Sequence, residues 1–219
     1  MVAMQRRRRG VHAPAPSTEP KPPEAPEADP IDLLEQAWLL IRSRGIRAEI
    51  VGGRIVVSPW ASRRHDQVVH RLVRQLSAVV YERDWDFYHS WAVHIPPHRG
   101  DKRLPDLMVA PPDSPEYDEN QAFGHGLLLV AEVVSPSSEE DDYEIKPAEY
   151  ARAGVPLMLV IDPESDEPTV TLFSGPADHG YANKLTVVAG DQLALPEPFD
   201  IKLDTAALFP AAKDQRKSL

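Results

Sequence analysis

One stretch of the chain, residues 127–134, reads Leu-Leu-Leu-Val-Ala-Glu-Val-Val, and it constrains the fold more than any other feature. A strand that is apolar at nearly every position is typical of a sheet that is covered on both faces. Leu157–Ile161 has the same character. The two runs therefore predict a central sheet with its strands buried between other layers.

Helical and strand periodicities surround these two runs. Asp29-Pro30 is an N-cap followed by a residue suited to the first helical turn, and the helix that begins there should end near Gly45. A second helix is expected at about 62–81 and a short one at about 147–153. Further strands are expected at 48–51, 54–57, about 86–95, about 104–110, 170–173 and 185–188, with a loop at 111–124. This order predicts an α/β (α+β) domain with a mixed sheet, two or three helices and a closing C-terminal hairpin.

The ends of the chain differ from its centre. Seven of the 23 prolines lie in residues 1–30, where large apolar side chains are almost missing. Such a segment cannot bury enough surface to offset the entropy cost of ordering. We therefore expect a disordered basic tail at 1–29, one domain at 30–210 and a flexible end at 211–219. Arg6–Arg9 could form a nucleic-acid arm, although a solvated basic tail is the simpler interpretation.

Composition excludes several classes of protein. Cysteine is absent, so disulfides, thiolate metal sites and cysteine nucleophiles are ruled out, and a reducing cytoplasm fits. No apolar run approaches the roughly 18 residues of a membrane helix. The formal net charge is −10, which taken alone argues against binding to nucleic acid.

Two carboxylates stand at apolar positions. Asp106 follows Pro105 at the head of an expected strand, and Glu132 interrupts the buried run. Burying an ionised carboxylate without a partner costs several kcal/mol, so each needs a cation or a hydrogen-bond network. Glu132 could pair with Lys146 or Arg152, and Asp106 could simply cap a turn.

The charge is concentrated around these two residues. Residues 105–170 hold sixteen acidic and two basic residues, whereas residues 31–104 hold eight acidic and twelve basic ones. An acid-rich site with few cationic partners favours a bound Mg²⁺ or Mn²⁺. The acidity is therefore local and does not forbid DNA, but it predicts weak, salt-dependent DNA binding.

Five ordered motifs resemble a known family. They are Gly-Gly-Arg-Ile-Val-Val-Ser-Pro…Arg-His-Asp (52–66), Pro-Asp-Leu-Met-Val (105–109), Val-Ala-Glu-Val-Val-Ser-Pro-Ser-Ser (130–138), Asp142…Lys146…Tyr150-Ala-x-Ala-Gly-Val-Pro and Val-Ile-Asp-Pro (160–163). Over about 45–205 the chain is similar to the putative restriction endonuclease family of the PD-(D/E)XK nuclease superfamily. This resemblance implies a restriction endonuclease-like core, a central mixed sheet flanked by helices.

The resemblance also implies an active site. Asp106 and Glu132 would be the metal carboxylates for Mg²⁺ or Mn²⁺, and the backbone carbonyl of Val133 would be a further ligand. The superfamily usually has its lysine two residues after the glutamate, where this chain has Val134. The family resembled here commonly carries the lysine on the following segment, which matches Lys146. The implied activity is DNA phosphodiester hydrolysis, with a homodimer to cut both strands.

Three further residues are possible accessories. Glu49 resembles an acid near the superfamily's first helix, but a surface acid is the more common outcome. His65 resembles the family's recurrent histidine, but on an apolar stripe it is more often a core residue. Asp142 could orient Lys146 or touch a second metal, with solvent exposure as the simpler interpretation. Pro147 predicts that the helix begins near Lys146, leaving residues 135–145 as a polar loop.

Other sites and functions are weaker. His89 and His94 would point to opposite faces of one strand, so a three-histidine site with His98 is rejected. A nuclease-fold module without catalysis, binding nucleic acid or protein, is the alternative function because position 134 lacks the lysine. A metal-dependent phosphoesterase acting on another substrate is the third hypothesis.

Overall fold

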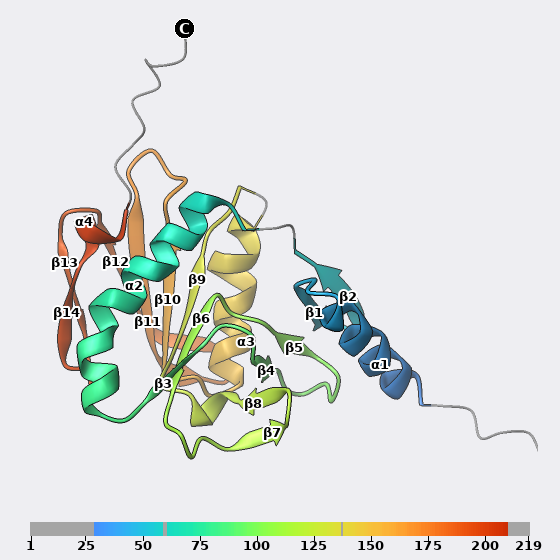
Figure 1. Ribbon diagram of the computed structural model, residues 1–219. Coiled ribbons are helices and arrows are strands. Elements are labelled where there is room, and N and C mark those ends of the chain that lie inside the picture. Colours follow the sequence, from blue (N-terminus) through green and yellow to red (C-terminus); the bar gives the residue numbers. More distant parts are fainter. Residues whose placement is uncertain (1–28, 59–60, 137, 210–219) are drawn as a thin grey trace, which may run out of the picture.

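Two six-stranded sheets and the helices that flank them make up residues 29–58, 61–136 and 138–209, which the computed structural model describes (Figure 1). Of the tails expected at 1–29 and 211–219, all but Asp29 lie outside the described residues, as does Arg6–Arg9. No helix among the residues described is long and apolar enough to cross a membrane.

The central sheet has the strand order β12-β11-β10-β9-β6-β3. Its strands are β3 (Asp86–Tyr88), β6 (Leu107–Ala110), β9 (Leu129–Val133), β10 (Leu157–Asp162), β11 (Thr169–Ala177) and β12 (Gly180–Val188). The sheet is mixed because β9 and β10 run parallel while the other neighbours run antiparallel. All residues of β9 and β10 are buried, which confirms the prediction from their continuous apolar character.

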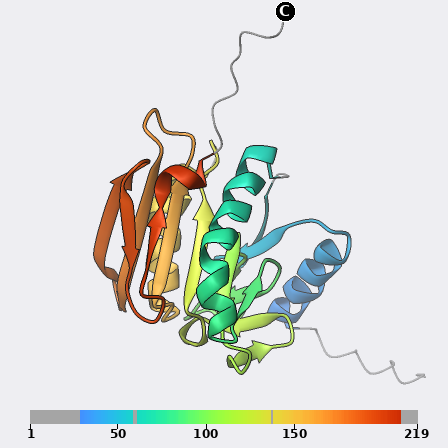
Figure 2. The same ribbon diagram turned by 60° about the vertical axis from the view of Figure 1, so that its left-hand side comes forward.

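Helices cover both faces of this sheet (Figures 1 and 2). The apolar stripe of α2 (Arg63–Glu82) packs on one face against the odd-numbered residues of β9, Leu129 to Val133. On the other face, Val130 and Val134 pack with Tyr150 of α3 (Lys146–Arg152). Because strand residues alternate between faces, Glu132 is on the α3 side. This layered arrangement confirms the predicted α+β architecture.

The second sheet has the order β2-β1-β5-β4-β8-β7. Its strands are β1 (Ala48–Val51), β2 (Arg54–Val57), β4 (Ala92–His94), β5 (Lys102–Arg103), β7 (Glu116–Asp118) and β8 (Gln121–Phe123). Helix α1 (Pro30–Ser43) packs on it through the buried Trp38, whose Nε1 donates to the carbonyl of Ala48. The short helix η1 (Gly124–Gly126) leads back to β9.

Several expected boundaries are confirmed and others are wrong. The first hairpin has the predicted bounds, and Asp29 caps α1 by accepting from the Ile31 amide. The single strand expected at 86–95 is instead β3 and β4, which belong to different sheets. The expected loop at 111–124 contains the hairpin of β7 and β8. Strands of three residues are too short to show a periodicity in the sequence.

The closing hairpin of β11 and β12 is confirmed and is longer than predicted. A second hairpin follows, formed by β13 (Gln192–Leu195) and β14 (Ile201–Asp204), and then α4 (Thr205–Leu208). Its apolar residues extend the core beneath α2. The sequence did not predict this last hairpin.

The segment before α3 is the most informative difference from the prediction. Residues 139–140 are already helical, and a π-helical turn, η2 (Asp141–Ile145), runs directly into α3. The amide of Lys146 donates to the carbonyl of Asp141, five residues back. Pro147 has no amide to donate, and the wider turn accommodates it without ending the helix. The α-helical segment α3 begins at Lys146, but the helical winding already begins at residue 139, so the predicted helix start and the expected polar loop are wrong over residues 139–145.

Candidate active site

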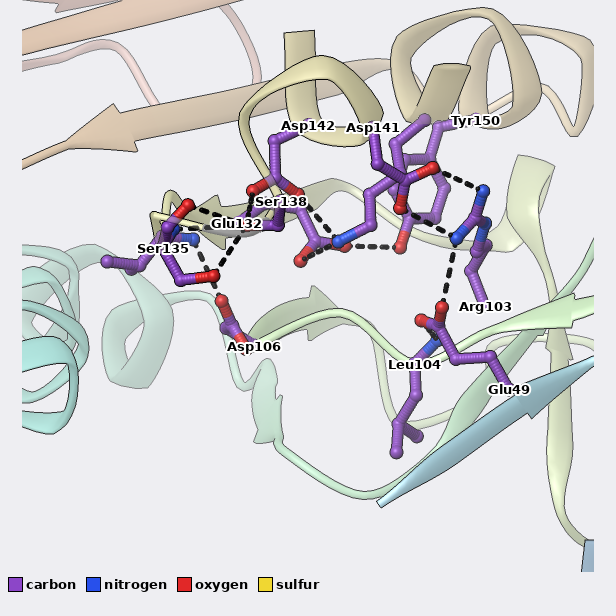
Figure 3. Close-up of polar contacts among 12 residues, drawn as sticks. Glu49, Arg103, Leu104, Asp106, Glu132, Ser135, Ser138, Asp141, Asp142 and Tyr150 are labelled. Carbon is purple, nitrogen blue, oxygen red and sulfur yellow. Dashed lines mark hydrogen bonds and ion pairs between the residues drawn. The ribbon is translucent and has the colours of Figure 1, made fainter. Parts of the chain in front are cut away.

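Asp106 and Glu132 come from adjacent positions on neighbouring strands. In the antiparallel pair of β6 and β9, Leu107 lies opposite Ala131, so the same register continued by one residue brings Asp106 to Glu132. The amide of Asp106 donates to the carbonyl of Ala131 at 3.1 Å. Opposed residues of antiparallel strands project from the same face. Figure 3 shows Asp106 and Glu132 in one cluster of polar residues, with Arg103, Glu49 and Asp141 grouped at its other side.

Three groups hold the carboxylate of Asp106. Its Oδ2 accepts from the Val133 amide at 2.8 Å and contacts His65 Nε2 at 2.9 Å, and its Oδ1 pairs with Arg47 Nη2 at 2.9 Å. Burial alone would raise the pKa of Asp106, but the His65 hydrogen bond and the Arg47 charge outweigh it and lower that pKa. Asp106 is therefore ionised and has its own cationic partner.

His65 reaches this carboxylate from the start of α2. Ser62 caps the helix by accepting from the His65 amide at 3.2 Å, which fixes the first turn beside the ends of β6 and β9. Burial would lower the pKa of His65, but the hydrogen bond to Asp106 raises it. The interpretation of His65 as an ordinary core residue is thus replaced by a direct contact with a site carboxylate.

Glu132 is almost completely buried and has two partners from α3. Its Oε2 accepts from Lys146 Nζ at 2.9 Å, and its Oε1 accepts from the Tyr150 hydroxyl at 2.7 Å. Arg152, the other partner considered, donates instead to the carbonyl of Pro96. Burial raises the pKa of Glu132 to about 8; Lys146 opposes this rise, while Asp106 adds to it. Glu132 therefore takes up a proton more readily than an ordinary glutamate, mainly because it is buried.

Lys146 is fixed by a second acid. Its Nζ donates to Asp142 Oδ1 at 2.7 Å, and Asp142 also accepts from the Ser138 hydroxyl at 2.6 Å. Asp142 is 1% exposed, so the expectation that it faces solvent is wrong. The π-helical turn directs Asp142 and Lys146 toward the same site. Burial would lower the pKa of Lys146, but Glu132 and Asp142 raise it, so the ammonium stays protonated.

Glu49 belongs to a neighbouring network rather than to the surface. It is buried, accepting from the Leu104 amide at 2.7 Å and from Arg103 Nη1 at 3.0 Å. The Arg103 guanidinium, itself buried, also pairs with both oxygens of Asp141 and with Glu149. The surface interpretation of Glu49 is therefore wrong, and Arg103 ties β1 and β5 to η2 and α3 (Figure 3).

Sequence reasoning missed three residues of this site, namely Arg47, Arg103 and Tyr150. Tyr150 lies four residues after Lys146, so helical spacing places both on one face and could have indicated it. Arg47 and Arg103 approach from distant segments, and their types and spacing carry no local signal.

The histidines do not form a site of their own. His89 Nδ1 contacts the main-chain oxygen of Asp106 at 3.1 Å, whereas the His94 ring stacks on Tyr117 at 4.1 Å between centroids. Across residues 29–58, 61–136 and 138–209, no group of three or more His, Asp or Glu side chains is arranged as a metal cage. The expectation that His89 and His94 share one strand is wrong, because His89 follows β3 and His94 ends β4, which belongs to the other sheet.

A groove of about 950 Å³ gives access to the carboxylates. The first hairpin, the start of α2, the ends of β6 and β9, and η2 form its walls. Its lining includes Arg47, Glu49, His65, Asp106, Glu132 and Lys146. The groove therefore contains every side chain that the sequence singled out for catalysis.

The donor set suits one kind of metal. Mg²⁺ is usually held by one or two carboxylates together with waters and substrate phosphates, not by a complete protein cage. Asp106 and Glu132, two carboxylates on neighbouring strands that line one groove, match that pattern. Each has a basic partner, Arg47 or Lys146, so the expectation of a site with few cationic partners is wrong. The residues present therefore fit Mg²⁺ or Mn²⁺ better than they fit a closed structural site.

Residues 32–207 match the model of the Uma2 family, described as putative restriction endonuclease. The chain belongs to this family. Its fold is similar to that of a crystal structure from Anabaena variabilis described as a putative nuclease belonging to DUF820, with a TM-score of 0.57 and 18% sequence identity. The similarity covers 74% of this chain and 89% of that chain, and it supports the nuclease-like fold alone. No curated protein matches the chain.

Proposed function

We propose that this Uma2 family member is a divalent-metal-dependent endonuclease that hydrolyses DNA phosphodiester bonds. The observation that carries the proposal is the meeting of Asp106, Glu132 and Lys146 in one groove, from two strands and a helix. Membership of a family described as putative restriction endonuclease supports the same reaction.

Asp106, Glu132 and the main-chain carbonyl of Val133 are the groups that would hold Mg²⁺ or Mn²⁺. When bound, such an ion supplies Lewis-acid charge for phosphoryl chemistry. Tyr150 and Lys146 hold Glu132 in position, because each donates a hydrogen bond to one of its two carboxylate oxygens. Within the described residues, neither of them donates to Asp106.

Lys146 acts as a fixed positive charge. Its raised pKa makes it a poor base at neutral pH, so the ammonium is suited to stabilising negative charge that develops on the phosphate. Val134 supplies no charge there, since it is an apolar residue that packs in the core with Tyr150. The lysine on the following helix reaches Glu132 from the side that faces the groove.

The three accessory residues position other groups in this scheme. Asp142 holds the Lys146 ammonium, and Glu49 fixes the Leu104 amide two residues before Asp106. His65 orients the Asp106 carboxylate. None of the three needs to bind the metal.

DNA would bind weakly and with strong dependence on salt and on the divalent cation. Sixteen acids against two bases in residues 105–170 repel a phosphate backbone until cations screen them. Tight binding in EDTA would therefore count against the proposal. The homodimer expected for cutting both strands stays a prediction, as does the single domain at 30–210.

The test is cleavage of supercoiled plasmid and labelled oligonucleotides in Mg²⁺, Mn²⁺ or EDTA. Asp106→Asn and Glu132→Gln should each lower the rate at least about a hundredfold, whereas Asp113→Asn, which changes an exposed acid outside the groove, should not. Thermal unfolding checks that each variant is folded. Equal cleavage by the wild type and both groove variants would indicate a contaminant and refute the activity. Metal-dependent DNA binding without cleavage would instead favour the non-catalytic module.

A further inference from the structure

We propose that Arg47 is a phosphate-binding residue that pairs with Asp106 in the metal-free protein and leaves this carboxylate when a divalent cation binds there. Without metal, its guanidinium neutralises Asp106. With metal, it binds a non-bridging oxygen of the nucleic-acid backbone. The second half of this inference rests on the proposed function, whereas the first half concerns the metal-free protein alone.

The two oxygens of Asp106 are not equivalent. Oδ2 already has two partners, the Val133 amide at 2.8 Å and His65 Nε2 at 2.9 Å. Oδ1 is paired with Arg47 Nη2 at 2.9 Å. A cation that approaches Asp106 would therefore meet Arg47 at the oxygen with the most free lone-pair capacity. A guanidinium and a divalent ion cannot share that oxygen without strong repulsion.

Arg47 is also the groove cation most able to change partners. The lysine and arginine residues in the groove lining are Arg47, Arg103 and Lys146. Arg103 is 3% exposed and bound to three carboxylates, and Lys146 is held between two. Arg47 is 32% exposed and has one carboxylate partner within the described residues, together with the carbonyl of Leu104.

The chemistry of arginine suits the second partner. Its five N–H donors form a planar fork that matches two oxygens of a phosphate, and an ion pair with phosphate is charge-assisted. The released guanidinium would start beside Asp106, where the scissile phosphate must lie for hydrolysis. Among the described residues, the other arginine and lysine that line this groove, Arg103 and Lys146, are only 3% and 10% exposed.

The inference predicts that replacing Arg47 changes the affinities for metal and for nucleic acid in opposite directions. Arg47→Met removes the competing charge with a side chain of similar length, so Mn²⁺ measured by calorimetry without nucleic acid should bind about tenfold more tightly. The same variant should bind a fluorescent oligonucleotide about tenfold more weakly in Ca²⁺, a hard cation with similar ligand preferences. Arg47→Lys, which keeps the charge, should lie between the wild type and Arg47→Met in both measurements.

Arg54→Met is the matched control, because Arg54 is an exposed arginine on the same hairpin and does not line the groove. It should leave both affinities unchanged, and thermal unfolding should show each variant folded. Mn²⁺ affinity that is unchanged or lower in Arg47→Met overturns the inference, even if the wild type cleaves DNA. A second outcome is that Arg47→Met binds Mn²⁺ more tightly while the wild type neither binds nor cleaves nucleic acid. That result would refute the proposed function and the phosphate role of Arg47, but it would support competition between Arg47 and the metal for Asp106. Unchanged oligonucleotide affinity would refute the phosphate role.

Discussion

Replacing Arg103 by methionine should destabilise the protein more than any single change of a surface charge. The guanidinium is 3% exposed and binds Glu49, Asp141 and Glu149. Its removal leaves the carboxylate of Glu49, itself 7% exposed, without its cation. Breaking a buried ion pair by removing one partner costs about 3–5 kcal/mol. For a chain of this length, that loss lowers the melting temperature by roughly 10 °C.

The measurement is urea and thermal unfolding of the full chain, followed by circular dichroism. Arg99→Met is the control, since Arg99 is 67% exposed and lies 3.8 Å from Asp32. Its free energy of unfolding should change by less than about 0.5 kcal/mol. The double variant Arg103→Met/Glu49→Gln should recover at least about 1.5 kcal/mol, because the uncompensated charge is gone. A loss below about 1 kcal/mol in Arg103→Met, or no recovery in the double variant, would refute the reasoning.

Two further predictions concern buried polar groups. Tyr150→Phe removes the hydroxyl that donates to Glu132 at 2.7 Å, so the free energy of unfolding in urea should fall by about 2 kcal/mol. Tyr81→Phe is the control: Tyr81 is 73% exposed, and its replacement should leave the stability unchanged. Equal stability of the two variants would contradict this prediction. Burial and the charge of Lys102 lower the pKa of His94 in the folded protein. As the pH falls, His94 therefore takes up a proton at a higher pH in the unfolded chain than in the folded one. The free energy of unfolding should therefore fall as the pH drops below about 6.5, and this slope should be smaller in His94→Phe. An unchanged slope between pH 7 and pH 5 would show that His94 does not contribute.

The parts of the fold that the sequence predicts well are those with a strong local signal. Helices α1 and α2 show several turns of apolar periodicity, and β9 and β10 are continuous apolar runs. The break between β3 and β4 has no such signal, because each has three residues and the two pair with different sheets. Which sheet a short strand joins is decided by tertiary packing.

The residues of the candidate site likewise divide into those that have a local signal in the sequence and those that have none. Asp106 and Glu132 stand out because carboxylates at apolar positions need a physical reason, and Lys146 stands out because basic residues are scarce nearby. The contact between Arg47 and Asp106 depends on the order of strands in the second sheet, which no local pattern encodes. Asp142 is buried within a π-helical turn, at a place where Pro147 predicts a polar loop.

That turn has a consequence for the spacing of residues along the chain. An α-helix rotates by about 100° per residue, so a single extra residue in one turn changes the direction of everything that follows. Residues 141–145 hold such an extra residue immediately before Lys146. The distance in sequence between the glutamate and its lysine is therefore a poor guide to whether a relative retains the pair, and the winding of the intervening helix is the better one.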